Sequence, residues 1–294
     1  MKPNPVLKKL GFSDTDRLAI IHTDDIGNCQ ASLTAFKDLF AFGLISSGSV
    51  MVPCPWFNGA AEMCRSLPGV DMGVHITLTS EYDDYRWGPI STRDRSSGLL
   101  DEEGYFHHRA GGALSYADPF RVQLEILAQI DRALHAGIDV THIDTHMGAI
   151  AHQNFQASYI QAAIQHHLPA MIPRMDAAAF ERLGIDPDSA QAAAQTILAL
   201  EEQGLPLIDK VIGLPLDQPE NRLAIAKKLI SELPVGVTHF ILHPSTDTPE
   251  LRAMTSSWPS RVADYEAFQS EALRQFVRDQ GIQVIGYRHL RNLL

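Results

Sequence analysis

The chain has 294 residues, of which 45% are hydrophobic and 20% charged, as in an ordinary folded protein. Its formal net charge of −11 argues against a general nucleic-acid binder, whose affinity would depend on a basic surface. No apolar run reaches the roughly 18 residues that a membrane span needs, and residues 1–10 lack the apolar centre of a signal peptide.

Three cysteines, Cys29, Cys54 and Cys64, are odd in number and include no Cys-x-x-Cys pair. This pattern indicates free thiols in a reducing compartment, the cytoplasm, rather than a disulfide framework or a thiolate zinc site. The sequence leaves the oligomeric state open, and a homodimer is one candidate.

Short apolar runs alternate with helical stretches along the whole chain. We predict about seven strands, drawn from the runs 18–23, 45–52, 71–78, 140–145, 170–173, 206–211, 237–242 and 283–287. Helices are predicted at 31–42, 58–67, 119–136, 154–166, 221–233 and 265–280, and as a pair within 176–203 that divides near Asp186-Pro187. Such alternation implies a mostly parallel sheet, and about seven strands suit a closed or nearly closed β/α barrel better than a three-layer sandwich. Periodicity alone does not separate the two.

Residues 80–118 break this alternation. They are rich in Gly, Ser, Asp, Arg and aromatic residues and show no sustained period. A connection of this length is usually a functional loop or a small inserted element. We therefore predict a single domain over 1–294, with an insertion at about 80–118.

The first predicted strand ends in two adjacent carboxylates, Asp24 and Asp25, followed by Gly27. In parallel α/β proteins the ligand crevice lies at the carboxyl ends of the strands, so these acids are placed for chemistry. The alternative is an acidic cap on the helix that follows. The dipeptide alone does not decide between a site and a cap.

Histidines stand at the ends of three other predicted strands. They are His75, His146 and His243; His142 and Asp144 precede His146 at alternate positions and share its face of the strand. A lone histidine is more often an ordinary core or surface residue. Three ionisable groups on one face of an apolar strand, however, are costly to bury without partners.

Together these positions suggest metal-assisted hydrolysis. One aspartate and two histidines are a suitable ligand set for a divalent ion, and His142 and Asp144 can hold such ligands from behind. A divalent ion makes a bound water more acidic. A second carboxylate can then take the water's proton, and a histidine across the site can protonate a leaving group.

The motifs, taken in order, resemble the YdjC-like carbohydrate deacetylases, which include chitooligosaccharide and hopanoid deacetylases. The matching segments span nearly the whole chain: Asp24-Asp25-Ile26-Gly27, Gly73-Val74-His75-Ile76-Thr77-Leu78, His142-Ile143-Asp144-Thr145-His146, His243-Pro244 and Tyr287-Arg288. Any one motif is weak, whereas the ordered set is specific. The resemblance implies a distorted (β/α) TIM-like barrel that removes an N-acetyl group from an amino sugar or oligosaccharide and releases acetate.

The resemblance also implies a role for each matching position. Asp25, His75 and His146 are expected to bind one divalent cation, magnesium or zinc, with manganese or cobalt as alternatives. Asp24 is expected to act as general base on the metal-bound water, and His243 to protonate the leaving amine. The expected partner is a small N-acetylated saccharide.

Three positions depart from the family pattern. Ile26 replaces the usual Phe, Thr145 replaces the usual Ser, and Gly148 stands where many members have the second His of His-x-His. The last change removes a polar group near the expected site.

Candidate substrate contacts are Tyr82, Tyr85, Arg86 and Trp87 in the long segment, and Arg174, where the family often has an arginine facing the substrate. Aromatic faces can pack on the apolar face of a sugar ring. The alternatives are a loop anchored by its own aromatic residues and an ordinary surface ion pair for the arginine.

Two other functions stay open. One is a different metal-dependent hydrolase on the same scaffold, acting on a phosphoester, another amide or a lactone. The other is a non-catalytic sugar or metal binder, which only Gly148 favours.

Overall fold

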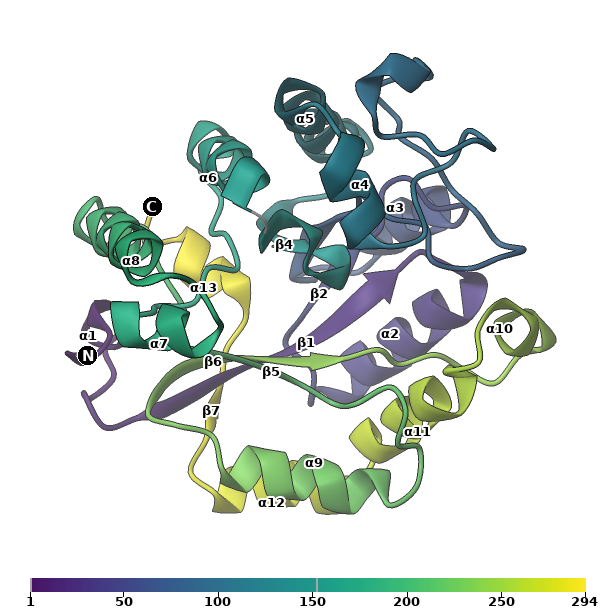
Figure 1. Ribbon diagram of the computed structural model, residues 1–294. Helices are drawn as coiled ribbons and strands as arrows, with labels where there is room; N and C mark the ends of the chain where they lie inside the picture. The colour runs from purple at the N-terminus through teal and green to yellow at the C-terminus, as the bar shows by residue number, and fades with distance from the viewer. Residues whose placement is uncertain (1, 152) are drawn as a thin grey trace.

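The computed structural model describes residues 2–151 and 153–294 and is organised around one sheet (Figure 1). The strands of the sheet are β1 Arg17–Ile26, β2 Ser47–Val50, β3 Met72–Ile76, β4 Val140–Thr145, β5 Lys210–Gly213, β6 Gly236–Leu242 and β7 Gln283–Val284. Their order is β4-β3-β2-β1-β6-β5, and β7 pairs with the first half of β1. All of these strand pairs are parallel.

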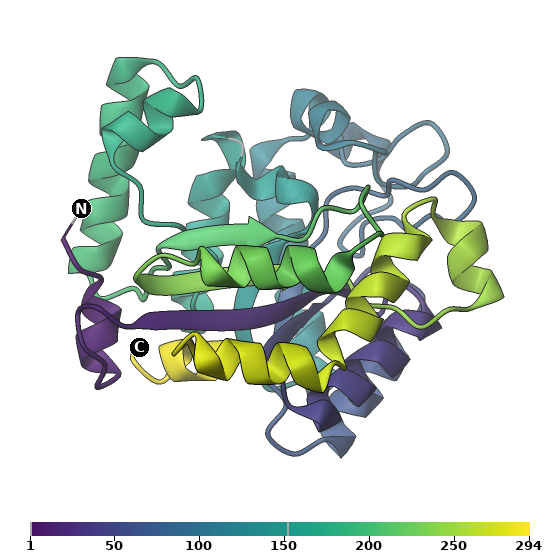
Figure 2. The same ribbon diagram turned by 90° about the horizontal axis from the view of Figure 1, so that it is seen from below.

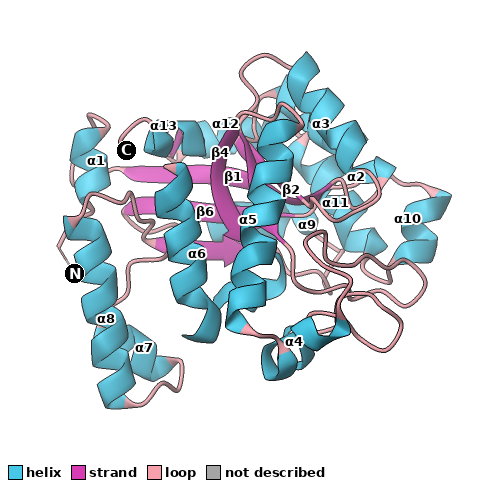
Figure 3. Cartoon of the chain, turned by 90° about the horizontal axis from the view of Figure 1, so that it is seen from above, coloured by secondary structure: helices cyan, strands magenta, loops and turns pink. Residues whose placement is uncertain are grey.

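Helices surround the sheet (Figure 3). They are α1 Pro5–Lys9, α2 Gln30–Phe42, α3 Phe57–Ser66, α4 Ala110–Tyr116, α5 Pro119–His135, α6 Gln153–His166, α7 Ala177–Arg182, α8 Pro187–Glu202, α9 Arg222–Ser231, α10 Pro249–Met254, α11 Trp258–Phe268, α12 Glu271–Asp279 and α13 Tyr287–Arg291. The pair α7 and α8 extends away from the sheet (Figure 2). Among the described helices, none has the length and apolar character needed to cross a bilayer.

The strands form a barrel-like arrangement that no continuous ladder closes. In the gap between β4 and β5, Ala170 forms an isolated bridge with Ile143, and Pro173 forms one with Ile208. The predicted strand 170–173 is therefore reduced to these bridges. The expected distorted barrel of seven mostly parallel strands in an α/β domain is confirmed.

Helix boundaries follow local capping chemistry. The Asp118 side chain accepts the amide of Phe120 at the start of α5, and Asp186 caps α8 in the same way, each just before a proline in the first turn. Gly43 ends α2 with φ +82°, a left-handed conformation that glycine adopts without a Cβ penalty. The predicted division of the 176–203 helix pair at Asp186-Pro187 is confirmed.

Several predicted boundaries were wrong. The helix expected over 265–280 is two helices, because the chain is extended at Ser270 between α11 and α12. The strand expected over 283–287 ends at Val284, since Tyr287 already opens α13. The run 206–211 contributes only the start of β5, which begins at Lys210.

The inner face of the barrel changes character along the strands. At their N-terminal ends it is apolar: Leu18 and Ile20 of β1 and Val237 of β6 pack with Leu7 of α1 and Leu290 of α13. Figure 1 places α1, α13 and both termini at this end of the molecule. The apolar plug confines water and ligands to the other end.

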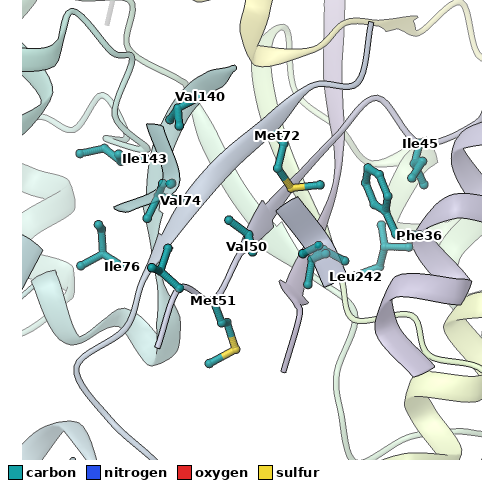
Figure 4. Close-up of a cluster of buried hydrophobic side chains, with 14 of the residues drawn as sticks. Phe36, Ile45, Val50, Met51, Met72, Val74, Ile76, Val140, Ile143 and Leu242 are labelled. Atoms are coloured by element: carbon teal, nitrogen blue, oxygen red, sulfur yellow. The ribbon is translucent and has the colours of Figure 1, made fainter. Parts of the chain in front are cut away.

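Towards the C-terminal ends of the strands the inner face is polar. Gly73 and His75 alternate along β3 with Met72, Val74 and Ile76, which face the outer core shown in Figure 4. On the other strands the buried polar residues include His22 and Asp24 of β1, His142 and Asp144 of β4, and His239 of β6. Because buried ionisable groups need partners, this half of the barrel is where a site is expected.

The long segment 80–118 contains α4 and a short 3-10 turn, Arg95–Ser97, and is attached to α5. Glu125 of α5 accepts the amide of Ile90 at 3.1 Å and that of Ser91 at 2.8 Å. Glu125 also accepts a hydrogen bond from Gln129 Nε2 at 2.8 Å, and Gln129 in turn pairs with the backbone of Thr77. One buried carboxylate thus fastens the segment to the barrel.

Replacing Glu125 with Ala should release this part of the segment, because two partly buried backbone N–H groups lose their acceptor. We expect the free energy of unfolding to fall by about 1–3 kcal/mol and amide exchange at residues 90–91 to accelerate. Denaturant unfolding and hydrogen-exchange mass spectrometry measure both. Glu102→Ala, on the exposed side of the same segment, is the control. Unchanged exchange at 90–91 would contradict the role given to Glu125.

Candidate active site

A cavity of about 320 Å³ opens at the C-terminal ends of the strands. The five acids and histidines singled out at the strand ends line it: Asp24, Asp25, His75, His146 and His243. They come from the ends of β1, β3, β4 and β6, far apart in the sequence. The structure therefore brings the strand-end acids and histidines to one place, as the parallel topology predicts.

The backbone of β1 is irregular at the two acids. Its register against β2 shifts between Thr23 and Ile26, and Asp25 has φ +62°. In a regular strand, neighbouring side chains point to opposite faces. The left-handed conformation, which aspartate tolerates better than most residues, lets both Asp24 and Asp25 reach the cavity.

Asp25, His75 and His146 form a compact cluster, in which one candidate ligand atom from each lies within 4.8 Å of the others. Asp25 Oδ1 lies 3.5 Å from His75 Nε2 and 3.1 Å from His146 Nδ1. This oxygen is buried and accepts no hydrogen bond of good geometry from any residue that the structure describes. An unpaired buried carboxylate oxygen beside two imidazole nitrogens fits a divalent cation.

Asp144 holds the His75 ring by its Nδ1 edge, which faces away from Asp25. His75 Nδ1 lies 2.9 Å from Asp144 Oδ1, and Asp144 Oδ2 accepts a hydrogen bond from Ser49 at 2.8 Å. Burial raises the pKa of Asp144, but the charge and hydrogen bond of His75, together with His22 and His142, outweigh burial, and the net pKa is lowered. The ionised Asp144 therefore fixes the ring with Nε2 facing the cluster.

Two residues that sequence reasoning missed hold the other cluster members. Glu81 Oε2 lies 2.9 Å from His146 Nε2, and Arg261 of α11 donates to Asp25 Oδ2 at 2.8 Å. Burial lowers the pKa of His146, yet Glu81 and Asp25 raise it to about 9. Burial likewise opposes the ionisation of Asp25, but Arg261, His146 and His75 together outweigh burial and hold the pKa of Asp25 well below the usual range.

Asp24 is held on one side only. Its Oδ1 lies 2.7 Å from His22 Nδ1, while Oδ2 lies 3.8 Å from His75 Nε2 and 4.0 Å from His243 Nε2. Burial raises the pKa of Asp24, but the combined effect of His75 and His22 is larger, so the net pKa is lowered. The carboxylate is therefore ionised at neutral pH. One of its oxygens is thus free to act in the cavity.

His243 sits across the cavity from the cluster. Its backbone amide donates to Asp264 Oδ2 at 2.9 Å, and Asp264 is paired with Arg222 at 2.5 Å. The Nδ1 atom of His243 is buried without a partner. Burial lowers the pKa of His243, so the ring is neutral at neutral pH and can donate a proton only after receiving one.

Three residues expected to contact a substrate do not line the cavity. Tyr85 donates to the Asn28 carbonyl, Arg86 binds Asp101 and the Phe106 carbonyl, and the Trp87 indole donates to the Thr79 carbonyl. These bonds anchor the long segment to itself and to the barrel. Among the candidate substrate contacts of the long segment, Tyr82 does line the cavity.

Arg174 is also placed elsewhere. Its guanidinium pairs with Asp209 at 2.8 Å and with Glu201, and it donates to the Lys2 carbonyl. Arg174 is not among the residues that line the cavity. It joins α8 and the N-terminal segment to the start of β5.

Gly148 has φ +64° and Met147 has φ +50°. Among the described residues, no heavy atom lies within 4 Å of the position that a Cβ on Gly148 would take. The backbone conformation, rather than lack of space, therefore favours glycine here. Met147 is half exposed and lines the cavity, an apolar surface beside His146.

Comparison with known proteins gives the family. The family model described as YdjC-like protein matches residues 18–279. The chain belongs to the YdjC-like family. A relative from Thermus thermophilus named carbohydrate deacetylase is 31% identical over 93% of this chain and 94% of its own length. A carbohydrate deacetylase of Thermoanaerobacter pseudethanolicus is 25% identical over 92% of this chain and 98% of its own length.

A solved structure of this fold comes from Enterococcus faecalis and is named as a candidate cellobiose-phosphate cleavage protein. It superimposes with a TM-score of 0.74 at 22% identity, covering 94% of this chain and 99% of that one. At this identity the likeness shows the fold alone.

In this YdjC-like protein, steric packing explains why the Gly-x-His motif begins with glycine. A Cβ at Gly73 would lie 2.4–2.6 Å from ring atoms of His142 on the neighbouring strand. Real Cβ contacts are never this short, so Gly73 leaves the space that the His142 imidazole fills.

Gly73→Ala should therefore displace His142 and destabilise the fold by about 1–3 kcal/mol, the usual cost of overpacking a buried site. Chemical denaturation measures the loss. Gly111→Ala is the control and should change little, because its backbone is helical and no heavy atom of the described part of the chain lies within 4 Å of the added Cβ. Equal stability of the two variants would contradict the packing argument.

Proposed function

We propose that this protein is a divalent-cation-dependent hydrolase that removes the N-acetyl group of an amino sugar or short saccharide and releases acetate. The observation that carries the proposal is the cluster of Asp25, His75 and His146 with its unpaired Asp25 oxygen, next to the free oxygen of Asp24. The relatives named carbohydrate deacetylase support the substrate class.

Asp25, His75 and His146 would hold the cation. One carboxylate and two imidazoles suit zinc or magnesium, with manganese or cobalt as alternatives. When bound, the cation would polarise the acetamide carbonyl and make a water more acidic. Arg261 and Asp144 lie outside the cluster and would support cation binding. Arg261 fixes the Asp25 side chain in place, and Asp144 fixes that of His75.

Asp24 would accept the proton that the attacking water loses. Its Oδ1 is fixed by His22, so Oδ2 is the atom that takes the proton. His243 would deliver a proton to the departing nitrogen as the C–N bond breaks. Because His243 is neutral at rest, its proton has to arrive during the reaction, and Asp24 Oδ2 at 4.0 Å is a source. Water is consumed, and acetate and a free amine leave.

The cavity of about 320 Å³ lies at the small end of ligand-binding pockets. We therefore propose that it holds one amino-sugar ring and that any further rings lie outside. The half-exposed Met147 and the Tyr82 side chain line it and replace the aromatic residues first expected to contact the sugar.

We also propose a reducing compartment, the cytoplasm. Cys29, Cys54 and Cys64 are free thiols and are buried. Burial raises the pKa of Cys29 to about 11 and that of Cys64 to about 12, which keeps these thiols protonated.

Removing the cation should abolish acetate release from N-acetylglucosamine and its short oligomers. We expect dialysis against a chelator to stop the reaction and a single divalent cation to restore it, as measured by an acetate assay. The same protein tested on a phosphoester and a lactone separates the deacetylase from other hydrolases. Acetate release that survives complete chelation would contradict the proposal.

Single substitutions should separate binding from proton transfer. His75→Ala should lose the cation and the activity, because a ligand is gone. Asp24→Asn should keep the cation and lose about 10²–10⁴-fold in kcat, the usual contribution of a general base. Metal content by mass spectrometry and kcat are the readouts. His135→Ala, on the exposed face of α5, is the matched control. An Asp24→Asn variant as active as wild type would refute the assignment of the base.

A further inference from the structure

A line of buried polar side chains runs beneath the candidate active site, from Asp71 to Asp24. At one end, Thr141 Oγ1 donates to Asp71 Oδ1 at 2.7 Å and lies 3.0 Å from His142 Nδ1. His142 Nε2 lies 2.9 Å from His22 Nε2. His22 Nδ1 lies 2.7 Å from Asp24 Oδ1. The five side chains form one continuous chain of hydrogen bonds.

The chain contains more hydrogen bonds than neutral groups can supply. Its four bonds need four protons, while one hydroxyl and two neutral imidazoles provide three. Both ends are carboxylates, which only accept when ionised. One additional proton therefore resides in the chain.

The direction of the bonds locates this proton. Asp71 also accepts from Ser47 Oγ at 2.8 Å and from the Arg288 amide at 2.7 Å, so it acts as an acceptor throughout. Thr141 donates its only hydroxyl proton to Asp71, so its oxygen accepts a hydrogen bond from His142 Nδ1–H. A neutral His142 then accepts at Nε2, and the donor to it is His22 Nε2–H.

We propose that His22 is a doubly protonated imidazolium that donates to both His142 and Asp24 and positions the Asp24 carboxylate. Both of its N–H groups are then used, and Asp24 Oδ1 is fixed while Oδ2 faces the cavity. That Asp24 acts as the base rests on the proposed function. The charge on His22 does not depend on that role, because it follows from the hydrogen-bond chain and from the groups around the ring.

The surroundings of His22 favour a positive charge on this ring and not on its neighbours. Asp24 contacts one side, and Asp144 Oδ2 lies 3.6 Å from Nε2. The ring of His239 lies 4.4 Å away, and burial lowers its pKa to about 3. Burial also lowers the pKa of His142. Two neutral imidazoles and two carboxylates thus surround His22.

The neutral rings are held rigidly. Tyr287 stacks on His142 with centroids 3.8 Å apart, its hydroxyl lies 2.7 Å from His239 Nδ1, and its ring lies edge-on 6.1 Å from that of His22. Gly73 leaves the space that the His142 ring occupies. His142 cannot easily turn away from His22, so the direction of the chain is set from the Asp71 end.

The test changes the far end of the chain and measures protonation of His22. In Thr141→Val the hydroxyl is lost, so His142 can move its proton to Nε2 and donate to His22, which then needs only one proton. Thr141→Ser keeps the hydroxyl and is the matched control. The readout is nitrogen NMR of the full-length protein with ¹⁵N-labelled histidine, with the His22 signals identified by their absence in His22→Asn.

We expect two protonated ring nitrogens on His22 at neutral pH in the wild type and in Thr141→Ser, and one in Thr141→Val. A singly protonated His22 in the wild type, which would leave the additional proton on Asp24, overturns the proposal. So does a His22 that stays doubly protonated in Thr141→Val.

Kinetics tests the positioning role. His22→Asn keeps an N–H near Asp24 Oδ1 without the charge, whereas His22→Leu keeps neither. We expect kcat to fall about tenfold in the first and about a hundredfold in the second, the usual range for groups behind a site, with KM and cation content unchanged. Equal kcat in wild type and His22→Leu overturns the role. A wild type that releases no acetate refutes the proposed function instead; the NMR result and the Asp24 orientation in a His22→Leu crystal structure then decide the proposal alone.

Discussion

The break in β1 at Asp25 is the constraint on which the candidate site depends. A regular strand would send one of the two neighbouring carboxylates outwards, into the apolar layer between strands and helices. The left-handed backbone at Asp25 and the shifted register turn both towards the cavity. They then take different partners: Arg261 and two histidines for Asp25, and His22 for Asp24. This small local irregularity separates a cation-binding role from a proton-accepting role within one dipeptide.

Burying so many ionisable groups in one half of a barrel would be prohibitive without pairing. Here the groups are arranged in two tiers. The upper tier consists of residues that line the cavity, such as Asp24 and His75. The lower tier consists of Asp144, His22 and His142, whose side chains hydrogen-bond to the upper tier and to one another. Below both lies the apolar plug closed by α1 and α13. The polar half is therefore rigid where chemistry is expected and sealed from water at its base.

Much of this arrangement could be predicted from the sequence, because strand ends in a parallel barrel meet at one edge. Asp24 and His243 are far apart in the chain yet line one cavity for that reason. The role of Arg261 could not be predicted, since α11 reaches Asp25 only through long-range packing. Nor does composition reveal whether an aromatic residue faces a cavity or its own loop: the Trp87 indole donates to the Thr79 carbonyl, and Trp87 is not among the residues that line the cavity. Helix periodicity also continued through Gln269-Ser270, where the chain in fact breaks.

The central claim is that Asp25, His75 and His146 share one divalent cation beside a free Asp24 oxygen. Anomalous diffraction from crystals grown with Mn²⁺ or Zn²⁺ tests it most directly. The account predicts a single strong peak in contact with Asp25 Oδ1, His75 Nε2 and His146 Nδ1, with Asp24 near the ion but not coordinated to it. A peak bound elsewhere, or none between these three atoms at saturating metal, would contradict it.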